Sequence, residues 1–424
     1  MAARAPFLNT AHSAYHHRER PSEDEELTRV GPGTPCGEYL RRFWQPVIVS
    51  EELRDLPRRL RILGEDLVVF RDRRGAVGLL ELHCPHRGTS LEFGLISETG
   101  IRCCYHGWLF DVDGTILETP GEPSDSTLKD RLYHGAYPVH EHQGLVFAYM
   151  GPPDQQPQFS VLDTFDLPGY RLTARQGSLW PCNWLQVKEN SMDPAHLAFL
   201  HTLPGSEGFT GDLRALGEWD WMETPIGMVY IDTRRQGDRV WIRVADFILP
   251  NIHQFPPNAD PMAQRTTINR PAATTWAVPI DDTHTMQIGY NHAREDREPR
   301  RGAGFGQDAS RPYEERQRVP GDYDAQVSVH GGVARHGLEH LASTDRGVIM
   351  LRNLIRRGIR AVQNGTQPGN IGFRNGKALA TFSHDRVVTG IPAAPTQEED
   401  KQLLREIARN VVIDAVRNEY ENAH

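Results

Sequence analysis

Apolar and polar residues alternate in short runs through the first third of the chain, which predicts β-strands joined by tight turns. Each run is rich in Val, Ile, Leu or Phe and is bounded by Gly, Pro or Asp. The runs lie at 45–50, 58–72, 75–82, 109–117 and 142–151. Asp113-Gly114, inside the fourth run, is the two-residue signal of a β-hairpin. We therefore expect a small all-β domain in this part of the chain.

The pattern changes after a Pro- and Gln-rich segment at 151–159, which indicates a linker. Beyond this linker, strand-like runs are mixed with stretches of helical periodicity. The strand-like runs lie at 227–235, 239–249, 274–280 and 285–290. The helical stretches lie near 183–202, at 344–362 and at 401–420.

Together these patterns predict an α+β fold in two domains. An N-terminal extension over 1–45 packs on the core, the all-β domain covers 46–155, and an α+β catalytic domain covers 156–424. A polar stretch from about Glu295 to Arg318 is expected to be a long surface loop.

Composition excludes several functional classes. The net charge of −9 provides no basic field to attract nucleic acid or an anionic membrane surface. No stretch approaches the apolar length of a membrane span, and the first residues lack the apolar core of a signal peptide. We therefore expect a cytoplasmic protein. Its 5 cysteines, an odd number, favour metal binding or isolated thiols over a disulfide framework.

Two short Cys/His pairs, Cys84-x-His86 and Cys103-x-x-His106, are separated by 16 residues. Both pairs lie beside turn-forming Gly or Pro, so they can converge on one metal centre. A zinc ribbon is one interpretation, although structural zinc pairs commonly use other spacings. Cys104 competes with Cys103, because neighbouring side chains in an extended loop point to opposite sides and cannot both readily bind one metal ion.

The two loops, CPHRG and CCYHGW, resemble the cluster-binding loops of the Rieske [2Fe–2S] family. The resemblance implies that Cys84 and Cys103 hold one iron and that His86 and His106 hold the other. The second loop departs from the family at Cys104, where proline is more usual. The family spacing assigns Cys103 as the ligand, whereas the rival register, Cys104-x-His106, would repeat the spacing of the first loop.

A second constellation, Asp193-x-x-His196-x-x-x-x-His201, lies in the first helical stretch. This spacing can bring two imidazoles to one metal, with a carboxylate near the first imidazole. Pro194 indicates that the helix is broken or begins there. An amphipathic helix with two incidental histidines is the alternative. One distant carboxylate would complete the two-His-one-carboxylate set of a non-haem Fe(II) site.

Both constellations together resemble the oxygenase component of Rieske aromatic-ring oxygenases over most of the chain. The resemblance implies a helix-grip-like catalytic domain, an antiparallel sheet with helices. It also implies that His196 and His201 ligate a mononuclear Fe(II), that Asp193 bridges the two metal centres, and that Asn190 lies near the iron.

The third iron ligand must come from far downstream. The candidates are Asp281, Asp282, Asp308, Glu339 and Asp345. Asp281 and Asp282 lie in a segment typical of a strand-end turn. We predict Asp345, because LASTDRGVIMLRN resembles the family stretch that supplies this ligand.

The resemblance also implies partners and a reaction. O2 is the co-substrate, and electrons from NAD(P)H arrive through a separate flavin and [2Fe–2S] reductase, possibly with a ferredoxin. A homotrimer or stacked trimers are expected, because in the family the short electron path runs between neighbouring subunits of a head-to-tail ring.

RVGPGTPCGEYLRRFWQPV and LKDRLYHGAYPVHEHQGLVFAYMGP resemble the phthalate dioxygenase and dehydrodivanillate O-demethylase branch. This implies hydroxylation of a small aromatic substrate such as a phthalate- or benzoate-type acid, with oxidative O-demethylation of a methoxylated aromatic as the alternative. Arg243, Asn251 and His253 are candidates for binding a substrate carboxylate or phenol, and surface or strand-pairing roles are their alternatives. An electron-transfer Rieske protein without oxygenase activity is the alternative from a different class.

Overall fold

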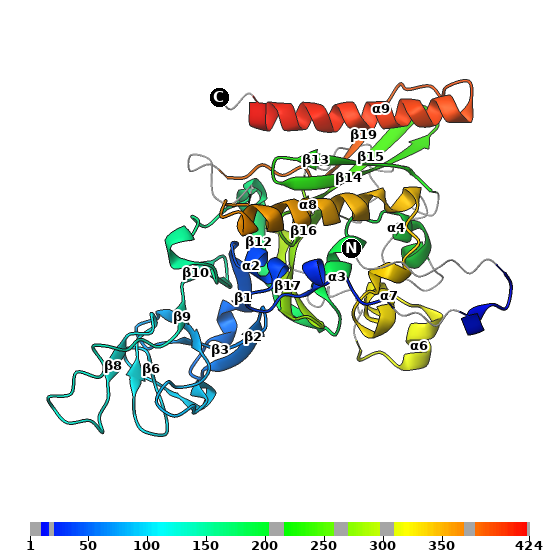
Figure 1. Ribbon diagram of the computed structural model, residues 1–424. Helices are drawn as coiled ribbons and strands as arrows, with labels where there is room; N and C mark the ends of the chain where they lie inside the picture. The colour runs from blue at the N-terminus through cyan, green and yellow to red at the C-terminus, as the bar shows by residue number, and fades with distance from the viewer. Residues whose placement is uncertain are drawn as a thin grey trace.

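The β-branched runs of the first third form the expected all-β domain, as the computed structural model shows (Figure 1). The structure describes residues 10–16, 21–202, 216–257, 270–296, 309–368 and 378–421. The strands of the all-β domain are β1 (Gln45–Val49), β2 (Arg58–Ile62), β3 (Glu65–Arg71), β4 (Val77–Glu81), β5 (Leu95–Ile96), β6 (Ile101–Arg102), β7 (Leu109–Phe110), β8 (Ile116–Glu118), β9 (Ala136–Tyr137), β10 (Val139–His142) and β11 (Leu145–Ala148).

These strands form three small antiparallel sheets, ordered β1-β11-β10, β2-β3-β4-β9 and β5-β6-β7-β8. The hairpin expected at Asp113-Gly114 joins β7 to β8. Gly114 has a φ of +86°, and a Cβ there would lie 2.1 Å from the carbonyl oxygen of His134. Only glycine fits this turn, so the hairpin signal in the sequence has a local steric cause.

The second domain is built on an antiparallel sheet of 8 strands within the described residues. Its order is β12-β18-β17-β16-β15-β14-β13, and β19 also pairs with β15. The strands are β12 (Tyr170–Trp180), β13 (Glu218–Thr224), β14 (Gly227–Gln236), β15 (Arg239–Ile248), β16 (Ile252–Phe255), β17 (Ala273–Asp281), β18 (His284–Arg294) and β19 (His384–Val388). The pattern predicted β14, β15, β17 and β18, whereas β12, β13, β16 and β19 are strands that it missed.

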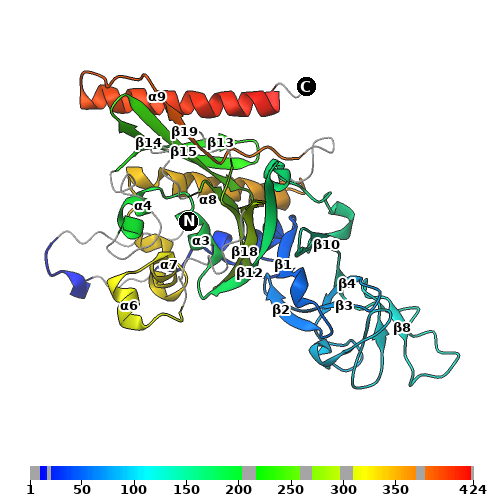
Figure 2. The ribbon, with the colours of Figure 1, turned by 180° about the vertical axis from the view of Figure 1, so that it is seen from behind.

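The helices cover both faces of this sheet. They are α1 (Glu25–Thr28), α2 (Pro35–Leu40), α3 (Trp184–Asn190), α4 (Ala195–Phe199), α6 (Tyr313–Arg318), α7 (Asp322–Val327), α8 (Arg346–Gln363) and α9 (Gln397–Val416). The part of the sheet formed by β13, β14 and β15 lies between α8 and α9 (Figures 1 and 2). None of the helices within the described residues is both long and apolar enough to span a membrane.

Alternation along β14 explains this layering. Val229 and Ile231 pack with Leu404 and Ala408 of α9 in one apolar cluster, while the intervening Tyr230 belongs to the cluster on the other face. Successive side chains of a strand point to opposite faces, so a strand that is apolar throughout can bury both faces.

The break expected at Pro194 is confirmed, and one expected loop is changed by the structure. The stretch near 183–202 forms two short helices, α3 and α4, separated around Pro194, because proline provides no backbone N–H for a continuous helix. The expectation of a continuous loop from Glu295 to Arg318 is wrong, because Tyr313–Arg318 forms α6. Residues 297–308 of that stretch lie outside the described residues. The helices expected at 344–362 and 401–420 are confirmed as α8 and α9.

Candidate active site and metal centres

Cys84 and Cys103 begin two loops with the same turn. The N–H of Gly88 donates to the carbonyl of Cys84 over 2.8 Å, and the N–H of Gly107 donates to that of Cys103 over 3.1 Å. Both glycines have a positive φ, +77° and +76°. Cys103 therefore occupies in the second loop the position that Cys84 occupies in the first.

The two thiols lie together in the interior, with only 3% of Cys84 and 2% of Cys103 exposed. Burial, opposed in part by the backbone of His86 and reinforced by the neighbouring Cys103, raises the pKa of Cys84 to about 11. Cys104, by contrast, is exposed. The geometry therefore favours the register in which Cys103 is paired with Cys84.

The two histidines of these loops lie above the thiols toward the surface. The ring centroids of His86 and His106 are 4.5 Å apart. His86 also stacks on Trp108, with centroids 4.9 Å apart and the ring planes 6° apart. Two buried thiols and two adjacent, more exposed imidazoles are the donor set that a [2Fe–2S] cluster of the Rieske type requires. The residues present fit that group.

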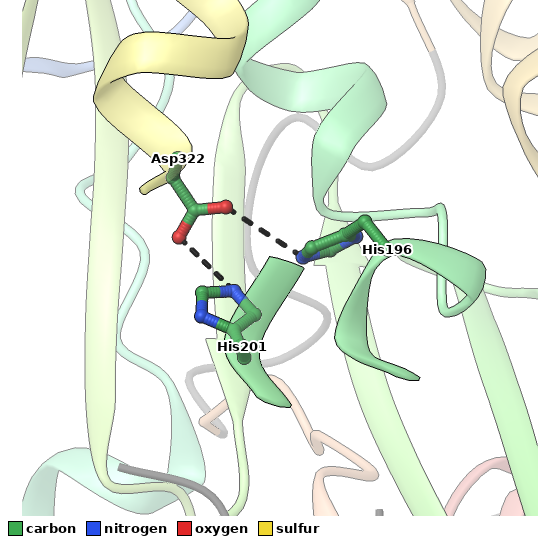
Figure 3. A group of neighbouring side chains, drawn as sticks. All are labelled: His196, His201 and Asp322. Carbon is green, nitrogen blue, oxygen red and sulfur yellow. Dashed lines mark ion pairs between the residues drawn. The ribbon is translucent and has the colours of Figure 1, made fainter. Parts of the chain in front are cut away.

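The second group of candidate ligands comes from three segments. His196 lies in α4, His201 in the 3₁₀ turn that follows α4, and Asp322 is the first residue of α7. Figure 3 shows the Asp322 carboxylate between the two imidazoles, one oxygen facing each ring. Its oxygens lie 3.7 Å from Nε2 of His196 and 3.3 Å from Nε2 of His201. Potential ligand atoms of all three lie within 4.8 Å of one another.

Neighbouring groups orient this trio. Nδ1 of His196 makes a short contact with the carbonyl oxygen of Asp193, which directs Nε2 toward Asp322. Nδ2 of Asn190 donates to Oδ1 of Asp322 over 3.2 Å. A ligating histidine commonly donates its other ring N–H to a backbone or carboxylate oxygen in this way.

The protonation states also suit metal binding. Burial lowers the pKa of His196, which favours the neutral imidazole that can donate a lone pair. Burial opposes ionisation of Asp322, but the hydrogen bond and charge of His201, and the charge of His196, lower its pKa overall. Two imidazoles and a carboxylate form the donor set of a two-His-one-carboxylate Fe(II) site. The residues present fit a mononuclear iron.

The structure brings Asp322, rather than the predicted Asp345, together with the two histidines. Asp345 lies just before α8, where its carboxylate accepts the backbone N–H of Ala342 over 2.7 Å. It lies near enough to Asp193 that its charge raises the pKa of Asp193, an effect secondary to burial. The Asp345 carboxylate is bonded to the backbone at the start of α8 and does not join the group formed with the two histidines.

The other downstream acids also have partners of their own. Asp281 accepts bonds from Thr283, Asp282 pairs with Arg29, and Glu339 pairs with Arg352. Asp308 lies outside the described residues.

Asp193, the predicted bridging carboxylate, lies beside His196 and is partly open to solvent. Its Oδ2 lies 3.8 Å from Nδ1 of His196, and 33% of its side chain is exposed. Its Oδ1 accepts the N–H of Ala195 over 2.9 Å. One carboxylate oxygen is therefore used within α4, and the other faces a candidate iron ligand.

Two of the three candidate substrate residues serve the fold instead. Arg243 is 2% exposed and pairs with Asp385 over 3.0 Å, and it also donates to the carbonyl of Pro256. Asn251 is fully buried and donates to Gln45 and to the carbonyl of Ala277. His253 remains near the candidate iron ligands, since charges on His196 and Asp322 affect its pKa, which burial lowers strongly.

The role assigned to Arg243 predicts a loss of stability. Arg243→Met should lower the free energy of unfolding by about 3–5 kcal/mol, because it leaves the buried Asp385 carboxylate without its cation. Chemical and thermal denaturation would measure this loss. The double variant Arg243→Met/Asp385→Leu should recover much of it. A single variant as stable as wild type would contradict the structural role.

The two candidate metal sites lie at opposite ends of one chain. Figures 1 and 2 both show the loops around β6 far to one side and α4 and α7 far to the other. Because projection can only shorten the distance between two points, this separation is real.

Comparison with known proteins identifies the family. The Rieske [2Fe–2S] domain matches residues 43–136. The oxygenase subunit of the tert-butanol monooxygenase / tert-amyl alcohol desaturase of Aquincola tertiaricarbonis is 44% identical, over 95% of this chain and 91% of that protein. The chain belongs to the Rieske non-haem iron oxygenases.

Other relatives agree with this assignment. The alpha subunit of phenoxybenzoate dioxygenase from Ectopseudomonas oleovorans is 37% identical to this Rieske oxygenase, over 89% of this chain and 95% of that protein. A solved structure of dicamba monooxygenase has a TM-score of 0.57 at 18% identity, covering 76% of this chain and 98% of that one. The fold expected from the sequence, an all-β Rieske domain followed by an antiparallel-sheet domain with helices, is confirmed.

This Rieske oxygenase is therefore the oxygenase component of a multicomponent system, and O2 and a [2Fe–2S] cluster belong to its chemistry. Sequence reasoning missed Asp322 as a site residue. Asp322 stands in Gly321-Asp322-Tyr323-Asp324, a pattern that is typical of an ordinary helix start. No local signal distinguishes it from the acids that cap other helices, so only the fold reveals it.

Proposed function

We propose that Cys84, Cys103, His86 and His106 hold the [2Fe–2S] cluster, and that His196, His201 and Asp322 hold the mononuclear Fe(II). The observation that supports this most directly is the convergence of the three side chains in Figure 3 from separate segments of the chain. A Rieske protein that only transfers electrons has no need of this second donor set, so the trio favours an oxygenase.

The chemistry that the iron supplies when bound is the activation of O2 with electrons received through the cluster. The chain's own residues prepare the site for it. Asn190 holds the Asp322 carboxylate, and the carbonyl of Asp193 holds the His196 ring, so the ligand atoms face one another before metal binds. Preorganisation of this kind lowers the cost of ordering ligands on binding.

Asp193 is proposed as the link between the two centres, acting between neighbouring copies of the chain. Its partly exposed carboxylate can accept a hydrogen bond from His86 or His106 of a neighbouring copy while it faces His196 of its own. The separation of the two sites within one chain supports a path between copies (Figures 1 and 2). A head-to-tail closed ring, a trimer or stacked trimers, would give every Asp193 such a neighbour.

Exposed apolar side chains at the Rieske end support such contacts. Phe93, Leu95, Tyr105 and Tyr133 are each more than half exposed, at 58–72%. Tyr105 is next to His106, with ring centroids 3.8 Å apart. Apolar surface beside a cluster-binding loop is expected where another protein docks.

The proposed reaction is oxygenation of a small organic substrate with electrons from a flavin and [2Fe–2S] reductase, with or without a ferredoxin. A solved complex of the carbazole dioxygenase oxygenase with its ferredoxin has a TM-score of 0.51 to this chain, which supports a partner of that kind. Aromatic acids are the first substrate class to test. Tertiary alcohols are the second class to test, because the relative that is 44% identical is named as a tert-butanol monooxygenase and tert-amyl alcohol desaturase.

The deciding experiment measures iron and O2 together. Purified protein should contain about three iron atoms per chain, the sum of a two-iron cluster and one mononuclear iron. O2 uptake should require both a reductase and an organic substrate. About two iron atoms per chain after anaerobic reconstitution, with no substrate-dependent uptake, would support the electron-transfer alternative.

The bridge assigned to Asp193 gives a separate prediction. Asp193→Asn should keep both metals, because no cluster or iron ligand is removed, yet lower turnover by about 10–100-fold, as loss of a ligand's partner typically does. Iron analysis, cluster absorption and O2 uptake would be compared with wild type. Unchanged turnover would rule out the bridging role.

A further inference from the structure

One row of residues crosses the large sheet on the face that carries α3. Arg175 of β12 pairs with Gly289 of β18, Gly289 with Thr275 of β17, and Thr275 with His253 of β16. Directly paired residues of an antiparallel sheet place their side chains on the same face. Since Gly289 has no side chain, Arg175 extends over it and donates from Nη2 to Oγ1 of Thr275 over 3.3 Å.

Lys188 contacts the same row from the helix α3. It lies in α3, which packs on β17, and its Nζ is 3.3 Å from the carbonyl oxygen of Thr275. Lys188 is 2% exposed. Two cationic side chains, Lys188 and Arg175, therefore meet at Thr275, and neither forms an ion pair with any carboxylate of the described part of the chain.

This lack of a carboxylate distinguishes Lys188 from the buried arginines within the described residues. Each of these arginines pairs with at least one acid. The pairs are Arg41 with Glu65, Arg234 with Asp232, Arg243 with Asp385, and Arg352 with Glu189 and Glu339. A buried charge without a partner is strongly unfavourable and usually neutralises. Burial, and then the charge of Arg175, lower the pKa of Lys188 to about 7.

The row ends beside the candidate iron site. Charges on Lys188, His196 and Arg243 all lower the pKa of His253, although burial is the main cause of its shift. Nε2 of His253 is buried and has no hydrogen-bond partner among the described residues. His253 therefore lies within electrostatic range of both Lys188 and the candidate iron ligands His196 and Asp322.

We propose that Lys188 and Arg175, which meet at Thr275, together bind the carboxylate of an anionic substrate. This inference rests on the proposed oxygenase function and assigns the residues that would select an acid over a neutral substrate. A carboxylate at Thr275 would supply a counter-charge that the described residues do not supply, and charge-assisted hydrogen bonds from an ammonium and a guanidinium are strong. A neutral tertiary alcohol would supply no counter-charge to either Lys188 or Arg175.

The test is the preference of the holoenzyme for an acid over its neutral, equally sized amide. Calorimetric titration without reductase, and therefore without turnover, would compare benzoate with benzamide and phenoxybenzoate with phenoxybenzamide. Wild type should bind at least one acid about tenfold or more tighter than its amide, the range expected for one or two hydrogen bonds to a charged group.

Variants then assign this preference to the two cations. Lys188→Met should weaken acid binding about tenfold and leave amide binding within about twofold, and Arg175→Gln should act in the same direction. Lys188→Arg keeps the positive charge and should keep most of the preference. Iron content and cluster absorption of each variant would establish that it is folded and loaded.

Two outcomes overturn the inference: a wild-type enzyme that binds neither acid better than its amide, or a Lys188→Met variant that retains the full preference. O2 uptake with reductase, measured on the same preparations, separates this from the proposed function. Uptake with tert-butanol and no acid preference contradicts the carboxylate site alone. An acid preference without substrate-dependent uptake contradicts the oxygenase function alone.

Discussion

Asp322→Ala is expected to empty the mononuclear iron site and to lower substrate-dependent O2 uptake by more than about 100-fold. Loss of a residue that merely supports a ligand already costs about 10–100-fold, and Asp322 supplies the anionic ligand itself. Its carboxylate contacts both His196 and His201, and its removal leaves two imidazoles without an anionic ligand beside them. Iron analysis should fall by one atom per chain, while the cluster absorption stays unchanged.

Asp345→Ala is the matched control. Its carboxylate bonds to the backbone of Ala342 at the start of α8, so its loss should cost about 1 kcal/mol of stability, typical of a helix-start bond, and should leave the iron in place. If Asp345→Ala loses the iron and Asp322→Ala keeps it, the roles of the two carboxylates are the reverse of those proposed.

Cys103→Ser is expected to abolish the cluster and, with it, all electron delivery to the oxygenase site. The Cys103 thiol is buried beside Cys84 and opens a turn identical in its hydrogen bond to that of Cys84. A hydroxyl in this position does not replace a thiolate ligand. Visible absorption and iron content would show the loss, with about one iron atom per chain remaining if the mononuclear site still fills.

Cys104→Ser is the neighbouring control. Cys104 is exposed and lies outside the pair of buried thiols, so the variant should keep the cluster, its absorption and its turnover. Loss of the cluster in Cys104→Ser, with retention in Cys103→Ser, would mean that Cys104 and not Cys103 is the cluster ligand of the second loop.

Motifs whose members lie close in sequence could be predicted well. Cys103-x-x-His106 and His196-x-x-x-x-His201 place their side chains together because one turn or one short helical segment determines their spacing. The amphipathic pattern likewise predicted α8 and α9, whose apolar faces follow helical periodicity over 18 and 20 residues. In each of these, the information is local.

Strands with polar side chains facing the interior were harder to predict. β12 carries Arg171, Thr173 and Arg175 on one face, of which Arg171 is exposed and the other two are partly buried. Polar residues at alternate positions do not show the apolar signal of a buried strand. In this fold the face of β12 that bears Arg175 meets Thr275. Arg175, one of the polar residues that made this strand hard to predict, is also part of the inferred substrate site.

The sequence by itself determined the family, the order of the two domains, the cluster loops and the two histidines of the second site, because each rests on spacing within a short segment. Only the tertiary structure chose Asp322 over Asp345. These acids both stand at helix starts, and their difference lies in which residues, far away in sequence, the fold brings beside them. Asp322 meets histidines more than a hundred residues earlier in the chain, whereas Asp345 meets its own backbone three residues away. Likewise, only the tertiary structure shows that no carboxylate of the described residues pairs with Lys188, because that depends on which distant segments the fold brings beside it.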